Sequence, residues 1–261
     1  MVQDFRGKVA FVAGASGGIN FAVARHLARR GAKVGIVSRS AERIEAAAQS
    51  LNAEGLNALG AAADVRNYDQ VVAAVEAMKS AFGAVDIVVS GAAGNFLSPA
   101  SELSANGFKT VVDIDLIGTF NVYRAALASL KTPGASLIAI TAPQGSRPFA
   151  QQVHACAAKA GVNMLTRVLA LEWGARGIRV NAISPGPIDG TEGVRRLWPD
   201  EASATRLQGE VPLGRLGHVD DIAEAVAYLA SPAAQYVTGT ILDVDGGYLW
   251  GTQANSMRGA A

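Results

Sequence analysis

Residues 14–20 have the composition of a phosphate-binding turn. They read Gly-Ala-Ser-Gly-Gly-Ile-Asn and directly follow the apolar run KVAFVA. Glycines allow a backbone to approach a pyrophosphate, and the start of the next helix offers free N–H groups and a positive dipole end. A plain tight turn is the alternative, but the position between a strand and a helix favours a dinucleotide site. We expect contacts to this cofactor from Gly14, Ser16, Gly17, Gly18 and Ile19.

The end of the second apolar run, KVGIVS, indicates which dinucleotide is bound. The run ends at Ser38, Arg39 and Ser40 follow, and the next carboxylate is Glu42. An acid at the end of this strand would hydrogen-bond a ribose 2′-hydroxyl and select NAD, whereas Arg39 can form charge-assisted hydrogen bonds with a 2′-phosphate. A solvated surface arginine is the alternative. We therefore predict NADPH as the cofactor, with Ser38 and Arg39 in its site.

Asp64 and Val65 follow the third apolar run. The Asp64 carboxylate can accept a hydrogen bond from the adenine amino group. An aspartate that only capped the next helix would give the same pattern. We include both residues in the predicted cofactor site.

Short apolar runs alternate with longer helical patterns along the whole chain. Continuous apolar strands separated by helices indicate a parallel sheet covered on both faces. Right-handed crossovers then produce a doubly wound α/β fold. Seven strands are expected, at Lys8–Ala13, Lys33–Ser38, Leu59–Asp64, Asp86–Ser90, Ser136–Thr141, Arg179–Ser184 and Ile241–Val244. Helices are expected at 20–30, 41 to about 54, about 67–82, 104–130, 151–175 and 219–230.

The chain shows no sign of division into domains. No linker rich in proline, serine or charge interrupts it, so we expect a single domain over residues 1–261. The longest part without a clear strand signal runs from Pro185 to about Leu213 and is punctuated by glycine and proline. A loop of this length in a compact domain is usually functional, so we predict a substrate flap at about 186–213.

The composition argues against several classes of partner. Lysines and arginines number 23 against 22 acidic residues, a formal net charge of +1. No global charge therefore attracts nucleic acid or an anionic membrane. The single cysteine, Cys156, rules out an internal disulfide and suits a reducing compartment. His26 and His218 have no acids or cysteines at ligand spacing, so we expect no metal site.

Targeting signals are not evident either. No apolar stretch approaches the roughly 20 residues that span a bilayer, and the amino terminus lacks the long apolar core of a signal peptide. The last three residues, 259–261, do not form a peroxisomal signal. We expect a cytoplasmic protein.

Over essentially its whole length the chain resembles the short-chain dehydrogenase/reductase family, which has a Rossmann fold. The matching pieces are the turn at 14–18, Asp64, the segment 91–94, Lys159 and the run NAISPGPI at 181–188. The resemblance implies that Lys159 binds the nicotinamide ribose and that residues 185–188 hold the nicotinamide carboxamide. The further cofactor-binding residues that it implies are Gly91, Ala92, Pro185, Gly186 and Ile188.

The chain departs from this family at the positions that carry its usual chemistry. The usual catalytic tyrosine aligns with Ala155, and the usual serine aligns with Ala142, next to Thr141. The usual asparagine aligns with Asp115, and a glycine of the turn aligns with Asn20. Alanine cannot donate a proton, so the usual reduction of a ketone is not expected.

One branch of the family, the 2,4-dienoyl-CoA reductases and especially the peroxisomal type, resembles this pattern. The match covers AAGNFLSP at 92–99, DIDLIGTFNV at 113–122, QVHA at 152–155 with Lys159, and residues 185–197. It implies NADPH-dependent reduction of a 2,4-dienoyl-CoA to a 3-enoyl-CoA in the degradation of unsaturated fatty acids. The wider family implies a homotetramer built on the long helices.

In such a reaction hydride goes to the δ carbon, charge develops on the thioester oxygen and a proton reaches the α carbon. We assign delivery of this proton to Asp115, acting directly or through a water oriented with Lys159. Lys159 would also add positive potential beside the developing dienolate. The alternatives are a helix-interior acid bonded by backbone groups and a solvated helix lysine.

Asn95 and Phe96 follow the fourth strand on the side where ligands bind in open α/β sheets. Asn95 is predicted to donate an N–H to the thioester oxygen, and Phe96 is predicted to form an apolar wall for the acyl chain. Loop packing is the alternative for both. Thr141 is left out of the catalytic residues because its hydroxyl can satisfy the strand end, and His154 is interpreted as structural.

Three arginines, Arg195, Arg196 and Arg215, fall in or near the flap. They can meet the phosphates of coenzyme A or be ordinary surface residues. Trp198 is interpreted as packing of the flap.

Two other functions stay open. One is a different short-chain reductase acting on a 3-oxoacyl thioester or a ketone, which Ala142 and Ala155 disfavour. The other is an NADPH-binding protein that has lost catalysis, since it too would lack the usual catalytic groups.

Overall fold

A computed structural model describes residues 4–198 and 200–251, and within these ranges the strands form one parallel sheet. The strand order is β3-β2-β1-β4-β5-β6-β7, which confirms the predicted doubly wound α/β fold. The strands are β1 (Val9–Ala13), β2 (Lys33–Ser38), β3 (Ala58–Ala62), β4 (Ile87–Ser90), β5 (Ser136–Ile140), β6 (Arg179–Pro185) and β7 (Ile241–Val244).

Strand β1 shows why these runs are apolar without alternation. All five of its residues are buried. Ala10 and Val12 point into the core on one face of the sheet, whereas Phe11 and Ala13 point into the core on the other. A strand covered on both faces buries every side chain, so its sequence reads as a continuous apolar run.

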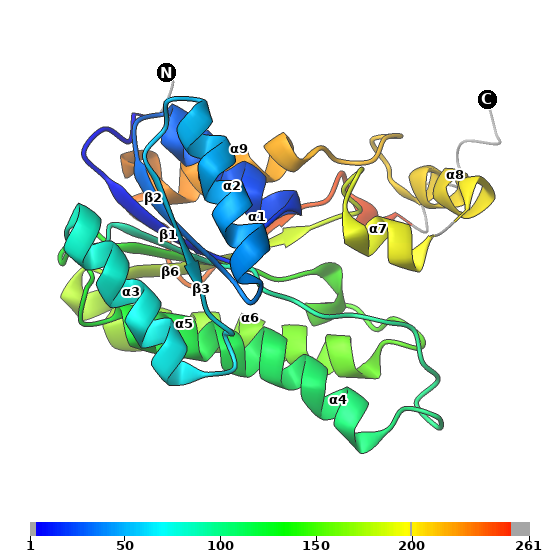
Figure 1. Ribbon diagram of the computed structural model, residues 1–261. Coiled ribbons are helices and arrows are strands. Elements are labelled where there is room, and N and C mark those ends of the chain that lie inside the picture. The colour runs from blue at the N-terminus through cyan, green and yellow to red at the C-terminus, as the bar shows by residue number, and fades with distance from the viewer. Residues whose placement is uncertain (1–3, 199, 252–261) are drawn as a thin grey trace.

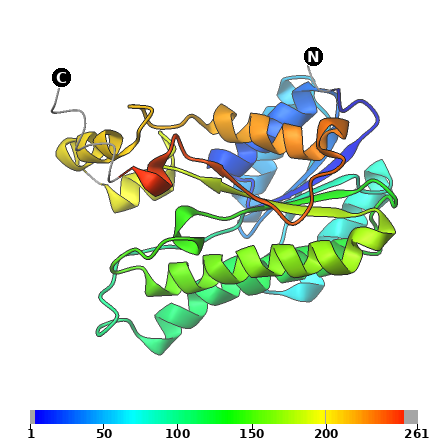
Figure 2. The same cartoon turned by 180° about the vertical axis from the view of Figure 1, so that it is seen from behind.

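Helices cover both faces of the sheet (Figures 1 and 2). On one face lie α1, α2 and α9, and on the other lie α3, α4, α5 and α6. Their bounds are α1 (Gly18–Arg29), α2 (Ala41–Ala53), α3 (Tyr68–Phe82), α4 (Ala105–Val112), α5 (Gly118–Ala126), α6 (Val153–Trp173) and α9 (Val219–Ala230). Short helical turns of the 3₁₀ type are η2 (Pro143–Gly145), η3 (Gly174–Arg176), η4 (Pro232–Ala234) and η5 (Tyr248–Trp250).

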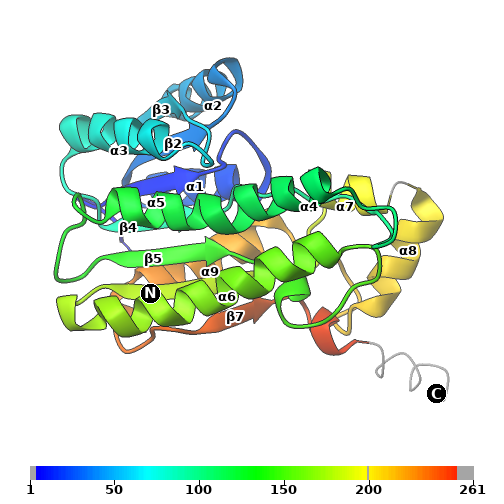
Figure 3. The ribbon, with the colours of Figure 1, turned by 90° about the horizontal axis from the view of Figure 1, so that it is seen from below.

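The order in which strands are added to the sheet reverses between β1 and β4. Strands β2 and β3 extend from β1 on one side, and β5, β6 and β7 extend from β4 on the other. The carboxyl ends of all strands meet at one edge of the sheet, toward α7 (Glu192–Leu197) and α8 (Glu201–Glu210) (Figure 3). Open α/β sheets bind their ligands at this edge, where the strand order reverses.

The helix predicted over 104–130 is not continuous. A π-helical turn, η1 (Asp113–Ile117), separates α4 from α5. A π turn adds a residue to the helical repeat and is frequent at functional sites. Sequence periodicity did not reveal it because the apolar pattern continues on both sides.

The segment from Pro185 to Leu213 was expected to be a loop, and this was wrong in detail because it contains α7 and α8. Thr191 caps α7, and Asp200 forms a capping box with Ser203 at the start of α8. Caps of this kind are visible in a sequence. The glycines and prolines around them masked two short helices.

Other differences are shifts of strand ends. Strand β3 ends at Ala62, so Asp64 lies beyond it in the following turn. No helix in the described ranges has the length and apolarity needed to cross a membrane. The residues 259–261, on which the expectation about a peroxisomal signal rests, lie outside the described ranges.

Candidate active site

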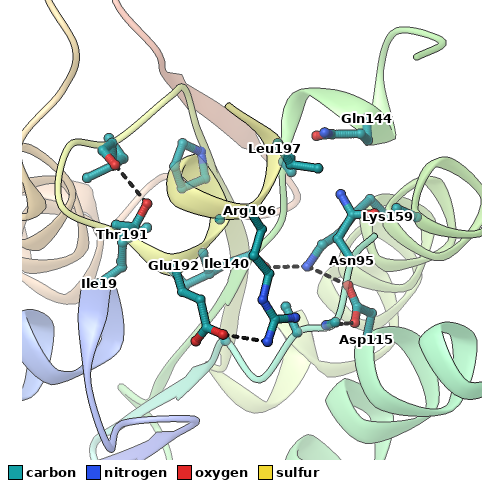
Figure 4. A pocket seen from close by; sticks show the side chains of 18 of the residues that line it. Ile19, Asn95, Asp115, Ile140, Gln144, Lys159, Thr191, Glu192, Arg196 and Leu197 are labelled. Carbon is teal, nitrogen blue, oxygen red and sulfur yellow. Dashed lines mark hydrogen bonds and ion pairs between the residues drawn. The ribbon is translucent and has the colours of Figure 1, made fainter. Parts of the chain in front are cut away.

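A cavity of about 570 Å³ opens at the carboxyl ends of the strands. Its walls come from the start of α1, the segments after β4, β5 and β6, the helices α4 and α6, and the short helix α7. Figure 4 shows Asn95, Asp115, Gln144 and Lys159 together on one side of this cavity. The cavity therefore combines the predicted cofactor segments with the predicted catalytic residues.

The turn before α1 leaves room for a ligand. A Cβ on Gly17 or Gly18 would meet no other atom within 4 Å, so the space above this turn is open. Gly14 has φ +80°, and a Cβ there would lie 2.7 Å from the backbone nitrogen of Ala92. Glycine at 14 thus lets the turn pack on the segment after β4, and the open turn faces outward at the start of a helix.

Asn20 replaces the glycine that the family usually has, and it joins two cofactor segments. Its Nδ2 donates to the carbonyl oxygen of Gly91 (2.8 Å) and, more weakly, to that of Gly14 (3.4 Å). The side chain is buried, and its Oδ1 has no hydrogen-bond partner among the described residues. The change from glycine therefore stiffens the turn rather than disrupting it.

Arg39 lies just past β2, is exposed and lines the cavity. The Ser38 hydroxyl donates to the carbonyl oxygen of Ser40 (3.4 Å), and Ser40 caps α2. No carboxylate lies between Ser38 and Glu42 to repel a phosphate. The geometry keeps Arg39 free to reach an anionic group at this edge.

Asp64 does not cap α3, because Asn67 is the capping residue. Arg66 binds the Asp64 carboxylate, with Nη2 and Oδ2 2.5 Å apart, and this hydrogen bond is the main cause that lowers the pKa of Asp64. The Val65 carbonyl oxygen accepts a hydrogen bond from Asn121 (2.9 Å). Asp64 is therefore held ionised as a hydrogen-bond acceptor, and its contact with adenine stays a prediction.

The other predicted cofactor residues divide between the cavity and its surroundings. Those that line the cavity are Ile19, Gly91, Pro185, Gly186 and Ile188. Ser16 borders a separate small hollow beside Phe21 and Arg43, and Ala92 packs against the core. Together the open turn, the buried unpartnered oxygen of Asn20 and the free Arg39 fit a dinucleotide with a 2′-phosphate.

The π-helical turn η1 carries Asp115 into the cavity wall. Thr119, one turn later, donates its hydroxyl to the Asp115 carbonyl oxygen (2.7 Å) and accepts from the Ser90 hydroxyl (3.2 Å). These two bonds fasten the turn to the end of β4. The Asp115 carboxylate accepts a further hydrogen bond from the backbone N–H of Gly94 (2.8 Å).

Lys159 and Asp115 form a buried ion pair. Lys159 Nζ lies 3.1 Å from Asp115 Oδ2, and the two side chains are 9% and 1% exposed. The ammonium donates its hydrogen bond to the carbonyl oxygen of Ile140 at the end of β5 (3.2 Å). The alternative of a solvated helix lysine is therefore wrong. The alternative for Asp115 holds in part, since Gly94 binds one of its oxygens.

The hydroxyl groups usual in the family are missing from this wall. Ala155 and Ala142 line the cavity in their place. The Thr141 hydroxyl is buried and donates to Asn163 Oδ1 in α6 (2.8 Å), so it bonds a neighbouring helix rather than the strand end. The Asp115–Lys159 pair lines the same cavity as these two alanines.

Asn95 uses one N–H of its side-chain amide inside the protein, and its predicted contact with the thioester oxygen stays a prediction. Its Nδ2 donates to Gln152 Oε1 (2.7 Å), and Gln144 Nε2 donates to the same oxygen (3.0 Å). Gln144 and Asn95 both line the cavity. Gln144 was not singled out from the sequence, and Gln152 was noted only as part of the run QVHA, without a role.

Phe96 lines the cavity and stacks on His154, with the ring centroids 4.3 Å apart. His154 is fully buried, and burial is the main cause that lowers its pKa. A buried imidazole with a lowered pKa agrees with the interpretation of His154 as a structural residue.

The flap arginines behave differently from one another. Arg196 lines the cavity and pairs with Glu192 (2.5 Å), as Figure 4 shows. Arg195 donates to the carbonyl oxygen of Gly190, and Arg215 pairs with Asp221 outside the cavity lining. Arg196 is thus the one of these three that the structure places at the site.

A small apolar cluster lies under the flap. Leu207, Val211 and Tyr248 form its buried part, and Trp198 packs against it. Tyr248 and Trp198 also line the cavity. The interpretation of Trp198 as flap packing therefore agrees with its contacts. Tyr248, which follows β7 by a few residues, was not among the residues predicted from the sequence.

Comparison with known proteins places the chain among reductases. A family model described as Enoyl-(Acyl carrier protein) reductase matches residues 14–249. The peroxisomal 2,4-dienoyl-CoA reductase ((3E)-enoyl-CoA-producing) of Pongo abelii is 48% identical over 258 residues, which cover 98% of this chain and 88% of that protein. The protein of the same name from Arabidopsis thaliana is 42% identical over 255 residues, or 94% and 85% of the two chains.

Solved structures show the same architecture. A gluconate 5-dehydrogenase from Burkholderia cenocepacia J2315, in complex with NADP and tartrate, has a TM-score of 0.88 and 32% identity over 94% of this chain and 96% of that chain. A short-chain type dehydrogenase/reductase from Mycobacterium marinum has a TM-score of 0.87 and 32% identity, with the same coverage.

Proposed function

Because the chain belongs to the short-chain dehydrogenase/reductase family, we propose that it reduces a 2,4-dienoyl-CoA to a 3-enoyl-CoA with NADPH, in the degradation of unsaturated fatty acids. Relatives 42% and 48% identical over nearly the whole chain bear the name of this reaction. A related structure at 32% identity binds NADP. Arg39 at the end of β2 agrees with that cofactor.

One observation in the structure supports the proposal most directly. The buried Asp115–Lys159 pair lies in the wall of a cavity where Ala142 and Ala155 replace the usual hydroxyl groups. Reduction of a ketone needs a proton on the new alkoxide oxygen, and neither alanine can supply it. Reduction of a conjugated thioester needs a proton on carbon and stabilisation of a thioester oxygen.

NADPH, when bound, supplies the hydride that reaches the δ carbon of the diene. Two electrons pass along the conjugated bonds to the thioester oxygen, and the α carbon then takes up a proton. One hydride and one proton are added, the double bond moves to C3, and no atom leaves. The residues of the chain must therefore hold the thioester, balance the charge on its oxygen and deliver the proton.

We assign the proton to Asp115, acting directly or through a water that it holds with Lys159. The Gly94 N–H and the Lys159 ammonium fix the two carboxylate oxygens in place. Lys159 also contributes positive charge, which has a large effect on a developing anion in a wall shielded from water. Phe96, Val111 of α4 and Ile114 of η1 line the cavity and would border the acyl group.

The test is an assay with paired substrates. The purified protein is mixed with NADPH and a 2,4-dienoyl-CoA, and the loss of nicotinamide absorbance is followed. A 3-oxoacyl-CoA of the same chain length is the control, and NMR of the product locates the remaining double bond. We expect consumption with the diene alone and a 3-enoyl product.

Other outcomes would favour the other functions. Consumption with the 3-oxoacyl thioester alone would favour a ketone reductase, and NADPH binding without turnover of either substrate would favour a protein without catalysis. A product with the double bond at C2 would retain the substrate and the cofactor but contradict the proposed site of protonation.

We also propose that residues 1–261 form one domain with a substrate flap at about 186–213. Helices α7 and α8 belong to this segment, and Arg196 and Trp198 from it line the cavity. Limited proteolysis with and without NADPH and a dienoyl-CoA tests the flap. Protection of this segment on binding is expected.

A homotetramer and a cytoplasmic location complete the proposal. Apolar side chains exposed on the helices opposite α1 and α9 support assembly, and these are Phe108, Ile117, Phe120, Met164, Val168 and Leu171. Light scattering on the purified protein tests the tetramer. The related reductases are named as peroxisomal, so imaging of the full-length tagged protein is needed to test the location.

A further inference from the structure

Three side-chain amides meet at the wall of the cavity. Asn95 follows β4, Gln144 lies in η2 after β5, and Gln152 directly precedes α6. Gln152 Oε1 accepts from Asn95 Nδ2 at 2.7 Å and from Gln144 Nε2 at 3.0 Å. One oxygen thus holds two amide nitrogens that belong to different loops.

Each of these nitrogens keeps a second hydrogen. A primary amide nitrogen carries two N–H donors, and only one from each residue is used by Gln152. Asn95 and Gln144 both line the cavity that contains Asp115 and Lys159. The structure therefore brings two unused N–H donors to one wall of the site.

The orientation of these amides follows from burial. Asn95 Oδ1 and Gln144 Oε1 are buried and have no hydrogen-bond partner among the described residues. If either amide were reversed, a buried NH₂ group would stand there with two unsatisfied donors instead of one acceptor. The nitrogens therefore face Gln152, and the arrangement leaves polar groups unsatisfied beside the cavity.

The position of Gln152 is fixed by the backbone before it. Gln151 has φ +64°, the one left-handed residue other than glycine in the described part of the chain. Its carbonyl oxygen accepts from the Ser98 N–H (2.9 Å), which ties the loop of Asn95 to the start of α6. Gln152 is 5% exposed and makes no side-chain cap to the helix. A strained, polar junction of this kind is typical of a functional wall.

Resting on the proposed function, we propose that Gln144 donates its second N–H to the thioester oxygen beside Asn95, the donor predicted from the sequence, and that Gln152 positions both donors. Charge grows on this oxygen when hydride reaches the δ carbon. Preorganised N–H donors stabilise such charge strongly. They take the place of the hydroxyl groups missing at Ala142 and Ala155. Asp115 and Lys159 are then left to supply the proton at the α carbon.

The first test is substitution of the donor. We expect Gln144→Met to lower the single-turnover rate of dienoyl-CoA reduction by on the order of 10²-fold at saturating NADPH. The effect should fall on kcat more than on KM, because the oxygen is charged only during the reaction. Gln49→Met, an exposed glutamine in α2, is the matched control and should leave the rate unchanged. The Kd for NADPH should not change in either variant.

The second test separates positioning from folding. Gln152→Met fills a similar volume but cannot accept the two N–H groups, so a loss as large as that of Gln144→Met is expected. Gln152→Glu keeps an oxygen acceptor and should recover at least tenfold of that loss. A merely structural role for Gln152 would give no such recovery. The single-turnover rate of each variant would then fall in proportion to the loss in its melting temperature.

A spectroscopic readout does not depend on turnover. A dienoyl-CoA bound together with NADP⁺ should absorb at longer wavelength than in water, because donors at the carbonyl oxygen polarise the conjugated system. We expect a smaller shift in Gln144→Met and in Gln152→Met than in the wild type. An unchanged shift and an unchanged single-turnover rate would overturn the inference. If the wild type fails to reduce any dienoyl-CoA, the proposed function itself fails, which is a separate result.

Discussion

Backbone atoms build the part of the cavity proposed for the cofactor (the cofactor side), whereas side chains build the part proposed for the acyl thioester (the acyl side). On the cofactor side, the turn at 14–18 leaves open space above Gly17 and Gly18, and Arg39 adds one charge. On the acyl side, Asp115, Lys159, Asn95 and Gln144 come from different elements and converge on one wall. The two regions also differ in how they are fixed, because the acyl side depends on a buried ion pair and a shared amide oxygen.

This difference explains how the chain can lose the usual catalytic hydroxyls and keep its cofactor site. A turn made of backbone depends on glycines that are next to one another in the chain. In a wall made of side chains, residues can be substituted one at a time, provided that the structure orients the new side chains toward the cavity. The π-helical turn η1 and the strained Gln151 are the local adjustments that orient them.

The largest expected effect concerns Asp115. We expect Asp115→Ala to lower the single-turnover rate at saturating NADPH by about 10²- to 10⁴-fold, because the proton at the α carbon loses its source. Asp113→Asn is the matched control, since Asp113 lies in the same π-helical turn but pairs with Lys109 away from the cavity lining.

Removal of Asp115 also leaves Lys159 unpaired in a buried place, so the melting temperature must be measured alongside the rate. A stable, NADPH-binding Asp115→Ala protein with an unchanged chemical step would remove Asp115 from the mechanism. The remaining residues of the acyl side would then only orient the substrate.

On the cofactor side, Arg39→Gln should weaken NADPH without affecting NADH. Loss of charge-assisted hydrogen bonds to the 2′-phosphate corresponds to about 1.5–3 kcal/mol, or roughly 10- to 100-fold in Kd. Titration of protein fluorescence with each cofactor measures the ratio. Arg176→Gln is the control, because Arg176 is exposed in η3 near the other end of the sheet. Equal weakening of both cofactors would contradict the proposed contact.

A smaller effect is expected for Asn20→Ala. The variant loses the hydrogen bond from Nδ2 to Gly91 and should reduce the free energy of unfolding by about 1 kcal/mol. It should also raise the Kd for NADPH, since the bond joins two cofactor segments. Denaturant unfolding and cofactor titration provide the two readouts, with the exposed Asn57→Ala as control. A change in the rate of the chemical step with unaltered cofactor binding would argue against a division between the two sides.

The smallest effect is a change in pH dependence at His154. Burial lowers the pKa of this imidazole in the folded protein, so the unfolded chain binds a proton first as the pH falls. Stability from the buried neutral ring is therefore present above the ordinary histidine pKa of about 6.5 and is lost below it.

His154→Phe keeps a ring against Phe96 and removes this titration. Its melting temperature should fall less than that of the wild type between pH 7 and pH 5. The difference between the melting temperatures of the two proteins at pH 8 provides the baseline. Parallel curves would show that His154 is not the group that titrates, and the wall at Phe96 would then be insensitive to pH.

Much of the fold could be predicted because the strands are buried on both faces. All seven predicted strands are present within the described residues, with ends shifted by a few residues. The helices in the flap and the π-helical turn were missed. Their signals are short, and in the case of η1 one inserted residue shifts only the phase of the apolar pattern, between helices of 8 and 9 residues that are too short to make the shift evident.

The candidate site divides in the same way. The turn at 14–18 and Arg39 could be found because their neighbours in sequence are also their neighbours in space. Asp115 and Lys159 were found through a family resemblance, and the structure brings them to 3.1 Å. The roles of Gln144 and Gln152 could not be found, because Gln144 lies in no motif and the run QVHA at 152–155 does not show which side chains Gln152 contacts.

The sequence by itself determined the strand and helix alternation, the phosphate-binding turn, the absence of an acid at the end of β2 and the loss of both usual hydroxyls. Only the tertiary structure decided that Asp115 and Lys159 are paired, that Asn95 is already bonded, and that Gln152 joins two amides. The physical reason is range. Burial and backbone conformation depend on residues close in the chain, whereas a hydrogen bond between side chains 57 residues apart exists only once the strands that carry them are packed.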